Sequence, residues 1–436
     1  MADPTARDPH LSAPAPSLSR RGVLKAAGIL GAGAALGAAP ALGRGVGAPA
    51  YVRRVGGPAA RNLVFMVADG MSSGVPALGD HLGRYTGKGL SALTRLSMGK
   101  GVYRAQCSTH CADGVVTDSA AASAAWSTGV KHRTGTLCLT GDGQRLTPLL
   151  VRAKQGGRRV GCVTTTTITH ATPAGWYASH ASRDAEREIG AQLLERDIDV
   201  ALGGGARYFA SDLASTAGRH VVRTRDELAK VTAGSERVLG LFSSKHLSMT
   251  LDREPHEPTL SEMAMFALER LSTAAGGGGF VLQIEGGRVD HAAHKNDAAG
   301  LVTDFRAFDE TVARVVEWVR ARNDTLLIIT TDHATANPGS TFYGQRGIDG
   351  LRRLAEGKHS LEWAFAGVPV REDDGRAASP ARQAEVLAQR VKEAVGIALG
   401  SEAQRALTRS MDQRAGEDNV AAGQSVGVDP FSAQCV

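Results

Sequence analysis

Continuous runs of apolar residues recur through the middle of this chain, and each ends at small or acidic residues. The first run covers residues 62–67 and ends at Asp69 and Gly70. Unbroken apolar runs are typical of strands that are buried on both faces. Helical segments separate the runs, so the pattern predicts an α/β fold with a largely parallel central sheet sandwiched between helices. The other runs of this kind lie at 159–163, 199–202, 280–284 and 325–329.

Apolar residues at helical spacing predict the elements between these strands. In residues 304–322, apolar side chains recur every three or four positions, which indicates a helix with one face in the core. Two regions, 207–258 and 340–380, are less regular, and we expect them to form excursions beside the sheet. Further helices are expected at 119–126, 148–155, 183–195 and 259–274.

Composition bounds the class of protein without choosing a function. The chain has 436 residues, of which 42% are apolar and 22% charged, so it is long enough for one large domain or two smaller ones. The net charge of +6 comes from dispersed arginines, with no basic run interleaved with aromatic residues. A nucleic acid is therefore not expected as a specific partner.

The N-terminal region has the features of a targeting segment. Ser-Arg20-Arg21-Gly-Val-Leu-Lys precedes an Ala/Gly-rich stretch over 26–39, followed by Ala-Pro-Ala41. This resembles a twin-arginine export signal. The stretch is too short and too weakly apolar for a spanning helix, which needs about 20 apolar residues. We expect a signal over 1–41, a linker over 42–61, a single domain over 62–436, and a periplasmic or secreted mature protein without a stable membrane span.

Cysteine usage is compatible with export. Five cysteines allow at most two disulfides and one odd thiol, and no Cys-x-x-Cys pair indicates a thiolate zinc site. The sequence leaves the pairing open. The cysteines are Cys107, Cys111, Cys138, Cys162 and Cys435.

Acidic and histidine residues form short clusters at the ends of predicted strands and at the start of a predicted helix. Asp290 and His294 are four residues apart, so on a helical turn they share a face and could hold one cation. Asp332-His333 forms a second such pair. In parallel sheets, ligands bind beyond the carboxyl ends of the strands, where these clusters fall. Oxygen and imidazole ligands suit catalytic zinc, whereas carboxylates with a hydroxyl suit magnesium.

Ser119 is the candidate nucleophile. It lies at the start of a predicted helix, where unpaired backbone N–H groups and the helix dipole favour an anion. Taken alone, Asp118-Ser119 would be interpreted more simply as a helix N-cap. The neighbouring acidic and histidine clusters favour a metal-activated hydroxyl instead.

Five ordered motifs resemble those of the alkaline phosphatase family, over about residues 62–340. The C-terminal hundred residues match that family poorly. The motifs are Val-Ala-Asp69-Gly-Met, Thr-Asp118-Ser119-Ala-Ala, His170-Ala-Thr172-Pro-Ala-Gly, Glu285-Gly-Gly-Arg-Val-Asp290-His-Ala-Ala-His294 and Thr-Thr-Asp332-His333.

The resemblance implies a role for each matched residue. Ser119 would be the nucleophile that becomes phosphoserine, and Arg183 would clamp the phosphate, since a guanidinium binds two phosphate oxygens at once. Two zinc ions and one magnesium ion are implied. Their ligands would be Asp69, Asp332 and His333 for the first zinc, Asp290 and His294 for the second, and Asp69, Thr172 and Glu285 for magnesium, to which His170 could add a ligand.

One departure from the family concerns the second zinc. The family places a third ligand, a histidine, near the C-terminus, but this chain has no histidine after His359. Three explanations stay open: a truncated or frame-shifted chain, a divergent ligand such as His359, or a weakened metal site. A catalytic zinc normally has three protein ligands, so with two the ion should bind loosely.

The function expected from the resemblance is that of an exported, metal-dependent phosphomonoesterase that acts on phosphate monoesters through phosphoserine. A homodimer is compatible with the family. One alternative is a non-catalytic or weakened relative that binds phosphate or metal. Another is a phosphodiesterase or sulfatase-type relative, although Ser119 is followed by alanines and lacks the Pro and Arg of sulfatase sites.

Overall fold

A computed structural model describes the chain at residues 60–209, 218–232, 237–274, 277–340, 343–366, 368, 371 and 375–417. These residues belong to one compact unit, Pro58–Val436. The predicted export signal over 1–41 lies outside the described residues, as does all of the predicted linker except residues 60 and 61. Cys435 also lies outside them.

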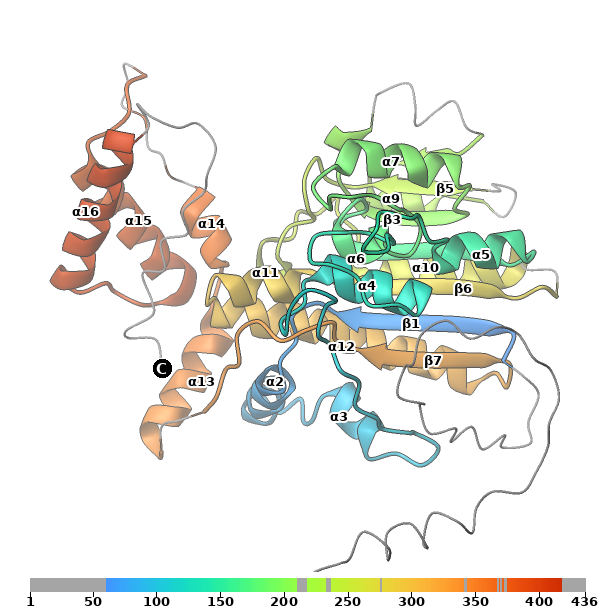
Figure 1. The fold of residues 1–436 in the computed structure, drawn as a ribbon. Helices are drawn as coiled ribbons and strands as arrows, with labels where there is room; N and C mark the ends of the chain where they lie inside the picture. The colour runs from blue at the N-terminus through green and yellow to red at the C-terminus, as the bar shows by residue number, and fades with distance from the viewer. Residues whose placement is uncertain are drawn as a thin grey trace, which may run out of the picture. The chain divides into compact units, whose positions relative to one another are not determined.

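The described chain is built on a seven-stranded sheet with the order β4-β5-β3-β2-β6-β1-β7. Every neighbouring pair of strands is parallel, which confirms the predicted fold class (Figure 1). The strands are β1 (Asn62–Ala68), β2 (Arg159–Thr167), β3 (Val200–Gly204), β4 (His220–Val222), β5 (Val238–Leu241), β6 (Phe280–Gly286) and β7 (Thr325–Thr330).

Two of these strands correct the sequence interpretation. Residues 207–258 were expected to form excursions beside the sheet, but β4 and β5 extend the sheet itself. They have only three and four residues, and the run that contains β5 is too short to stand out by its pattern. Their hydrogen bonds to each other and to β3 define them as strands, and that pairing is a tertiary property.

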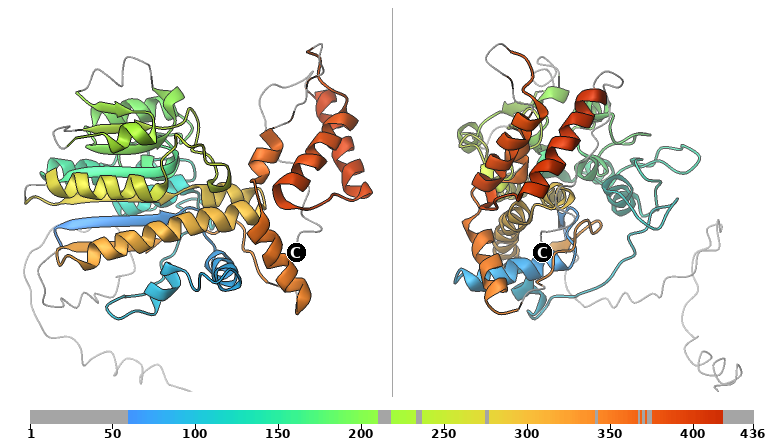
Figure 2. Two further views of the ribbon diagram at one scale, coloured as in Figure 1. Left: turned by 180° about the vertical axis from the view of Figure 1, so that it is seen from behind. Right: turned by 90° about the vertical axis from the view of Figure 1, so that its left-hand side faces the viewer.

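Helices cover both faces of the sheet. Seen from opposite sides, α4, α5 and α7 lie over one face, and α10 and α12 lie over the other (Figures 1 and 2). The helices are α2 (Gly74–Tyr85), α3 (Ala92–Ser97), α4 (Ser119–Thr128), α5 (Leu149–Gln155), α6 (Ala171–Ala174), α7 (Glu186–Glu195), α9 (Arg225–Ala229), α10 (Leu260–Ala274), α11 (Arg288–His294), α12 (Ala298–Arg320), α13 (Gln345–Glu356), α14 (Leu361–Ala366), α15 (Pro380–Val395) and α16 (Ser401–Glu417), with short 3-10 turns η2 (Ala206–Tyr208) and η3 (Thr250–Asp252).

The residues of β1 show why its sequence is an unbroken apolar run. Val64 and Met66 pack into the core beneath α10 and α12, whereas Phe65 and Val67 pack into the core on the opposite face. All four side chains are buried. A strand with helices on both sides needs apolar residues at every position, not at alternate ones.

The predicted helices are present, with shifted ends. The helix predicted over 304–322 is α12, which begins earlier because the Asp297 side chain accepts a hydrogen bond from Gly300 N at 2.9 Å and caps the helix. The region 340–380 contains α13 and α14. Helices α14, α15 and α16 share a small apolar core of their own, centred on Leu387 and Val391.

Two further properties bear on the sequence predictions. Among the residues that the structure describes, no helix is both long and apolar enough to cross a bilayer. The four cysteines in this part of the chain are free thiols: Cys107, Cys111, Cys138 and Cys162.

Candidate active site

Register in the sheet brings the acidic clusters to one edge. Val67 of β1 pairs with Glu285 of β6 on one side and with Thr330 of β7 on the other. Asp69 lies two residues after Val67 and Asp332 two residues after Thr330, so both lie just beyond the carboxyl ends of neighbouring strands. The parallel sheet therefore brings together carboxylates that are more than two hundred residues apart in sequence.

Ser119 is the first residue of α4, and Asp118 is the N-cap. The Asp118 carboxylate accepts hydrogen bonds from Ala121 N at 3.0 Å and from Gly135 N at 3.1 Å. Asp118 therefore satisfies the helix terminus, and the Ser119 hydroxyl is not needed for that purpose. That hydroxyl donates to Asp69 Oδ1 at 3.4 Å and lies 3.3 Å from His333 Nε2.

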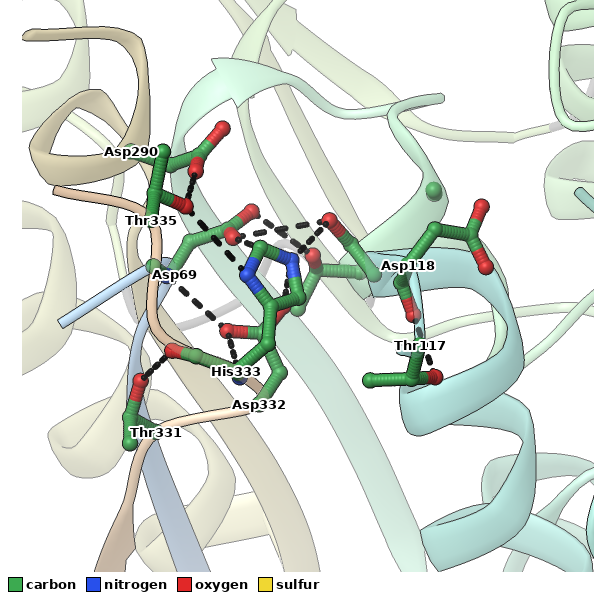
Figure 3. A network of polar contacts seen from close by, with 12 residues as sticks. Asp69, Thr117, Asp118, Asp290, Thr331, Asp332, His333 and Thr335 are labelled. Carbon is green, nitrogen blue, oxygen red and sulfur yellow. Dashed lines mark hydrogen bonds and ion pairs between the residues drawn. The ribbon is translucent and has the colours of Figure 1, made fainter. Parts of the chain in front are cut away.

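Asp69, Asp332 and His333 point toward one another (Figure 3). His333 Nε2 lies 3.6 Å from Asp69 Oδ1 and 3.3 Å from Asp332 Oδ2. Ligand atoms of the three residues lie within 4.8 Å of one another, close enough to share one ion. Both carboxylates are fully buried, and Gly70 N holds the second oxygen of Asp332 at 2.9 Å.

A second group shares Asp69 with the first. Ligand atoms of Asp69, His170 and Glu285 also lie within 4.8 Å of one another. Thr172 Oγ1 donates to Asp69 Oδ2 at 3.2 Å, which adds a hydroxyl to this group. One oxygen of Glu285 is held by the hydroxyl of Thr164, from the threonine-rich end of β2.

Asp290 and His294 lie one turn apart on α11, as predicted. Asp290 Oδ2 is 3.4 Å from His294 Nε2, and the His294 side chain is 66% exposed. Asp290 Oδ1 accepts a hydrogen bond from Thr335 Oγ1 at 2.5 Å. Within the described chain, neither group of three residues that could share an ion includes Asp290 or His294.

The unpaired atoms of the buried residues fit bound cations. Asp332 Oδ2 and Glu285 Oε1 are buried without a hydrogen-bond partner, although His333 Nε2 lies near the first of them. Burial, followed by repulsion from Asp332, Asp290 and Glu285, raises the pKa of Asp69 well above its usual value. Burial, reinforced by Asp332, also raises the pKa of Glu285. Buried carboxylates that repel one another and keep free lone pairs are suited to hold divalent cations.

Arg183 lies at this site and not on a helix surface. The helix that follows begins at Glu186, which leaves Arg183 in the preceding loop. Its guanidinium donates to Asp118 Oδ2 at 3.0 Å and to His170 Nε2 at 3.2 Å. Asp118 directly precedes Ser119, so the guanidinium is held beside the candidate nucleophile.

A model of the alkaline phosphatase family matches residues 60–360. The chain belongs to the alkaline phosphatase family. It is 36% identical over 232 residues to alkaline phosphatase 4 of Bacillus subtilis, which covers 50% of each chain. It is 32% identical over 335 residues to the tissue-nonspecific alkaline phosphatase of Gallus gallus, covering 63% of this chain and 64% of that protein.

A solved structure is similar as well. The crystal structure of Thermus thermophilus alkaline phosphatase superposes with a TM-score of 0.73 at 35% identity, covering 82% of this chain and 75% of that one. The chain spans about half the length of the Bacillus alkaline phosphatase that it matches. The residues matched to the alkaline phosphatase family include every candidate site residue, whereas α15 and α16 lie beyond them.

His359 was one possible substitute for the family's C-terminal zinc ligand. In the structure its Nδ1 lies 2.8 Å from Asp252 Oδ1, and its ring stacks on Trp363 with centroids 4.0 Å apart. The contacts of His359 within the described chain include neither Asp290 nor His294. His359 is thus part of the packing of α14 against η3.

The sequence analysis did not identify several residues that lie at the site. Thr335 contacts Asp290, Thr164 contacts Glu285, and His246 lies against the ring of His291 with centroids 4.5 Å apart. The run Thr164–Thr167 carried a usable signal, because four hydroxyls in a buried strand need polar partners. His246 belongs to no motif, and only the fold brings it to the site.

Proposed function

We propose that this protein is an exported, metal-dependent phosphomonoesterase in which Ser119 attacks phosphorus and becomes a phosphoserine. One observation carries the proposal: the Ser119 hydroxyl lies 3.4 Å from Asp69 Oδ1 and 3.3 Å from His333 Nε2, in a buried cluster of carboxylates with free lone pairs. Membership of the alkaline phosphatase family supports the same activity. Export is supported by the twin-arginine pattern alone, and assembly as a homodimer stays a prediction.

The donor sets support two zinc ions and one magnesium ion. Asp69, Asp332 and His333 would hold the first zinc, and Asp290 with His294 the second. Asp69, Thr172 and Glu285 offer only oxygen atoms, which suits magnesium. When bound, the cations supply Lewis-acid stabilisation and lower the pKa of a coordinated hydroxyl.

The protein residues would bind and orient the phosphate monoester. The N-terminal end of α4 presents free N–H groups and a positive dipole end toward the phosphate. Arg183, held by Asp118, offers guanidinium N–H groups to the phosphate oxygens. The Ser119 hydroxyl would lose its proton as its oxygen forms the new bond to phosphorus, while the bond to the ester oxygen breaks and that oxygen gains a proton. Water then cleaves the phosphoserine, which releases phosphate and regenerates the hydroxyl.

His170 fits a supporting role better than that of a ligand. A guanidinium can only donate, so His170 Nε2 accepts from Arg183 and the proton of the neutral ring lies on Nδ1. Burial, followed by the charge of Arg183, lowers the pKa of His170 and keeps the ring neutral. We therefore propose that His170 orients Arg183 and leaves the magnesium to oxygen ligands.

A second candidate function is a non-catalytic protein that binds metal and phosphate. It is favoured by the Asp290 and His294 pair, which has no third histidine or acidic ligand within the described residues and one strongly exposed imidazole. Bound zinc and phosphate without turnover of a phosphate monoester would support this function over catalysis.

The test is replacement of the nucleophile. We expect Ser119→Ala to abolish hydrolysis of p-nitrophenyl phosphate and to abolish the acid-stable phosphoenzyme trapped at low pH. Ser123→Ala is a matched control on the same helix, since its buried hydroxyl donates only to the carbonyl oxygens of Ala120 and Ala171. Normal turnover by Ser119→Ala would show that another group attacks phosphorus.

A further inference from the structure

Three histidine rings from distant segments meet beside the candidate active site. His170 follows β2, His246 follows β5, and His291 lies on α11. The ring of His291 is 5.6 Å from that of His170 and 4.5 Å from that of His246, measured between centroids. The His170 and His246 rings are 5.7 Å apart. By residue type alone, this histidine cluster (His170, His246 and His291) would be taken for a zinc site.

Hydrogen bonds argue against a metal held by all three rings. One nitrogen of each ring faces a group that can only donate: Arg183 for His170 Nε2, Thr167 N at 3.0 Å for His246 Nδ1, and Arg288 for His291 Nδ1. In a neutral imidazole, the other nitrogen then carries the proton. A protonated ring nitrogen has no lone pair for a metal, so the cluster presents N–H groups.

Each ring accepts one of these hydrogen bonds through a nitrogen lone pair, which requires a neutral imidazole, and the surroundings of the rings are basic. Burial, reinforced by Arg288, lowers the pKa of His246 to about 4. Arg207 and Lys295 add positive charge near His246, while Glu362 adds negative charge. Glu362 pairs with Arg288 and, at 3.2 Å, with Lys295. Neutral N–H donors within a cationic surround favour an oxyanion.

Two of the three free N–H groups are accessible. His170 Nδ1 is completely buried, whereas the Nε2 atoms of His246 and His291 are not among the buried atoms without partners. These two atoms also have no hydrogen-bond partner among the described residues, and neither is completely buried. They therefore form a pair of donors whose hydrogen-bonding capacity is unused inside the protein.

We propose that His246 and His291 form a subsite for a second phosphate-type oxyanion, next to the site where the phosphate monoester reacts. This deepens the proposed function and rests on it. Two contacts connect the subsite to the site of the reacting phosphate. The His291 ring lies against the His170 ring, and His170 Nε2 accepts a hydrogen bond from Arg183, the predicted phosphate-binding residue. Two sources can supply the oxyanion: a second phosphoryl group on the substrate, or free inorganic phosphate.

The first arm of the test compares two substrates on the full chain loaded with zinc and magnesium. Inorganic pyrophosphate carries a second phosphoryl group, and p-nitrophenyl phosphate does not. If the substrate supplies the oxyanion, His246→Phe lowers the ratio of kcat/KM for pyrophosphate over p-nitrophenyl phosphate by about 5-fold, the effect of one hydrogen bond. His246→Gln, which can place an N–H near the Nε2 position, restores the ratio. His256→Phe, at an exposed histidine whose ring is not part of the cluster, is the matched control.

The second arm counts phosphate ions bound to Ser119→Ala by equilibrium dialysis. If free phosphate fills the subsite, Ser119→Ala binds two phosphates per chain, and the double variant with His246→Phe binds one. An unchanged substrate ratio together with an unchanged count would overturn the subsite. Failure of the wild-type chain to hydrolyse either substrate would overturn the proposed function instead, and the dialysis count would still report on the histidine pair.

Discussion

The two predicted zinc positions lie side by side but differ in construction. Asp69 directly follows β1, and Asp332 and His333 follow β7. The three side chains are mostly or fully buried, and one carboxylate oxygen of Asp332 is unpaired. Asp290 and His294 come from a single short helix, and the His294 side chain is 66% exposed. The first position is fixed by the sheet, whereas the second depends on one helical turn. A preorganised, dry ligand set binds its ion more tightly than an exposed pair does, so occupancy should be unequal.

Replacing Asp69 should have the largest effect, because it belongs to both buried groups of ligands. We expect Asp69→Asn to lower kcat/KM for a phosphate monoester by about 1,000-fold, the size of several kcal/mol of lost cation stabilisation. Atomic absorption should show two ions lost from Asp69→Asn and one from Asp290→Asn. Equal metal loss in the two variants would mean that the positions are not distinct.

Gly70 contacts both predicted zinc positions: its N–H donates to Asp332, and its Cα lies against Asp290. A substitution at Gly70 can therefore test the second position without replacing a ligand. Its φ is +64°, and an added Cβ would lie 2.4 Å from Asp290 Oδ1 and 2.7 Å from Thr335 Oγ1. We expect Gly70→Ala to displace Asp290 and weaken the more exposed zinc by about 10-fold, comparable to the loss of a group that orients a ligand. Chelator competition would measure this. Gly129→Ala, at φ +79° with no atom within 4 Å of the added Cβ, controls for backbone strain alone.

Removal of metal should make the thermal stability of the protein depend on pH. We expect this effect to be smaller than those of Asp69→Asn and Gly70→Ala. Without cations, the pKa values of Asp69 and Glu285 are raised above their ordinary 3.8 and 4.5, so their contribution to stability is present at low pH and lost as pH rises toward neutrality. We expect Tm of the chelated protein to fall by roughly 5 °C between pH 5 and pH 8. The metal-loaded protein should not follow this trend. A rise in Tm of the chelated protein with pH would contradict the electrostatic account of the buried cluster.

Sequence patterns predicted the parts of the fold that have long, self-contained signals. The strands β1, β2, β6 and β7 and the helix α12 were visible because a buried strand or an amphipathic helix repeats its pattern over many residues. Strands β4 and β5 were missed because three or four residues cannot establish a period, and the neighbouring strand supplies their definition.

The candidate site likewise contains residues that the sequence could place and residues that it could not. Asp69, Ser119 and Asp332 could be placed at element ends and Asp290 on a helical turn. The structure brings Asp69 Oδ1 within 3.4 Å of the Ser119 hydroxyl, and ligand atoms of Asp69 and Asp332 within 4.8 Å of each other. The family resemblance added Arg183, whose position beside Asp118 no periodicity could have indicated. His246 could not be predicted, since its place depends on a backbone N–H of Thr167 that meets it across the fold.

The strand order dictates when the predicted metal ligands can meet. Gly70 and Asp332 are bonded across 262 positions of sequence, and Ser119 meets His333 across 214. A chain that has not yet added β7 beside β1 cannot bring Asp332 and His333, two of the three predicted ligands of the first zinc, next to Asp69. We therefore expect cations to bind only after this edge of the sheet has assembled, and not to nucleate the fold. Metal supplied during refolding should raise the final yield of stable protein without accelerating formation of the sheet.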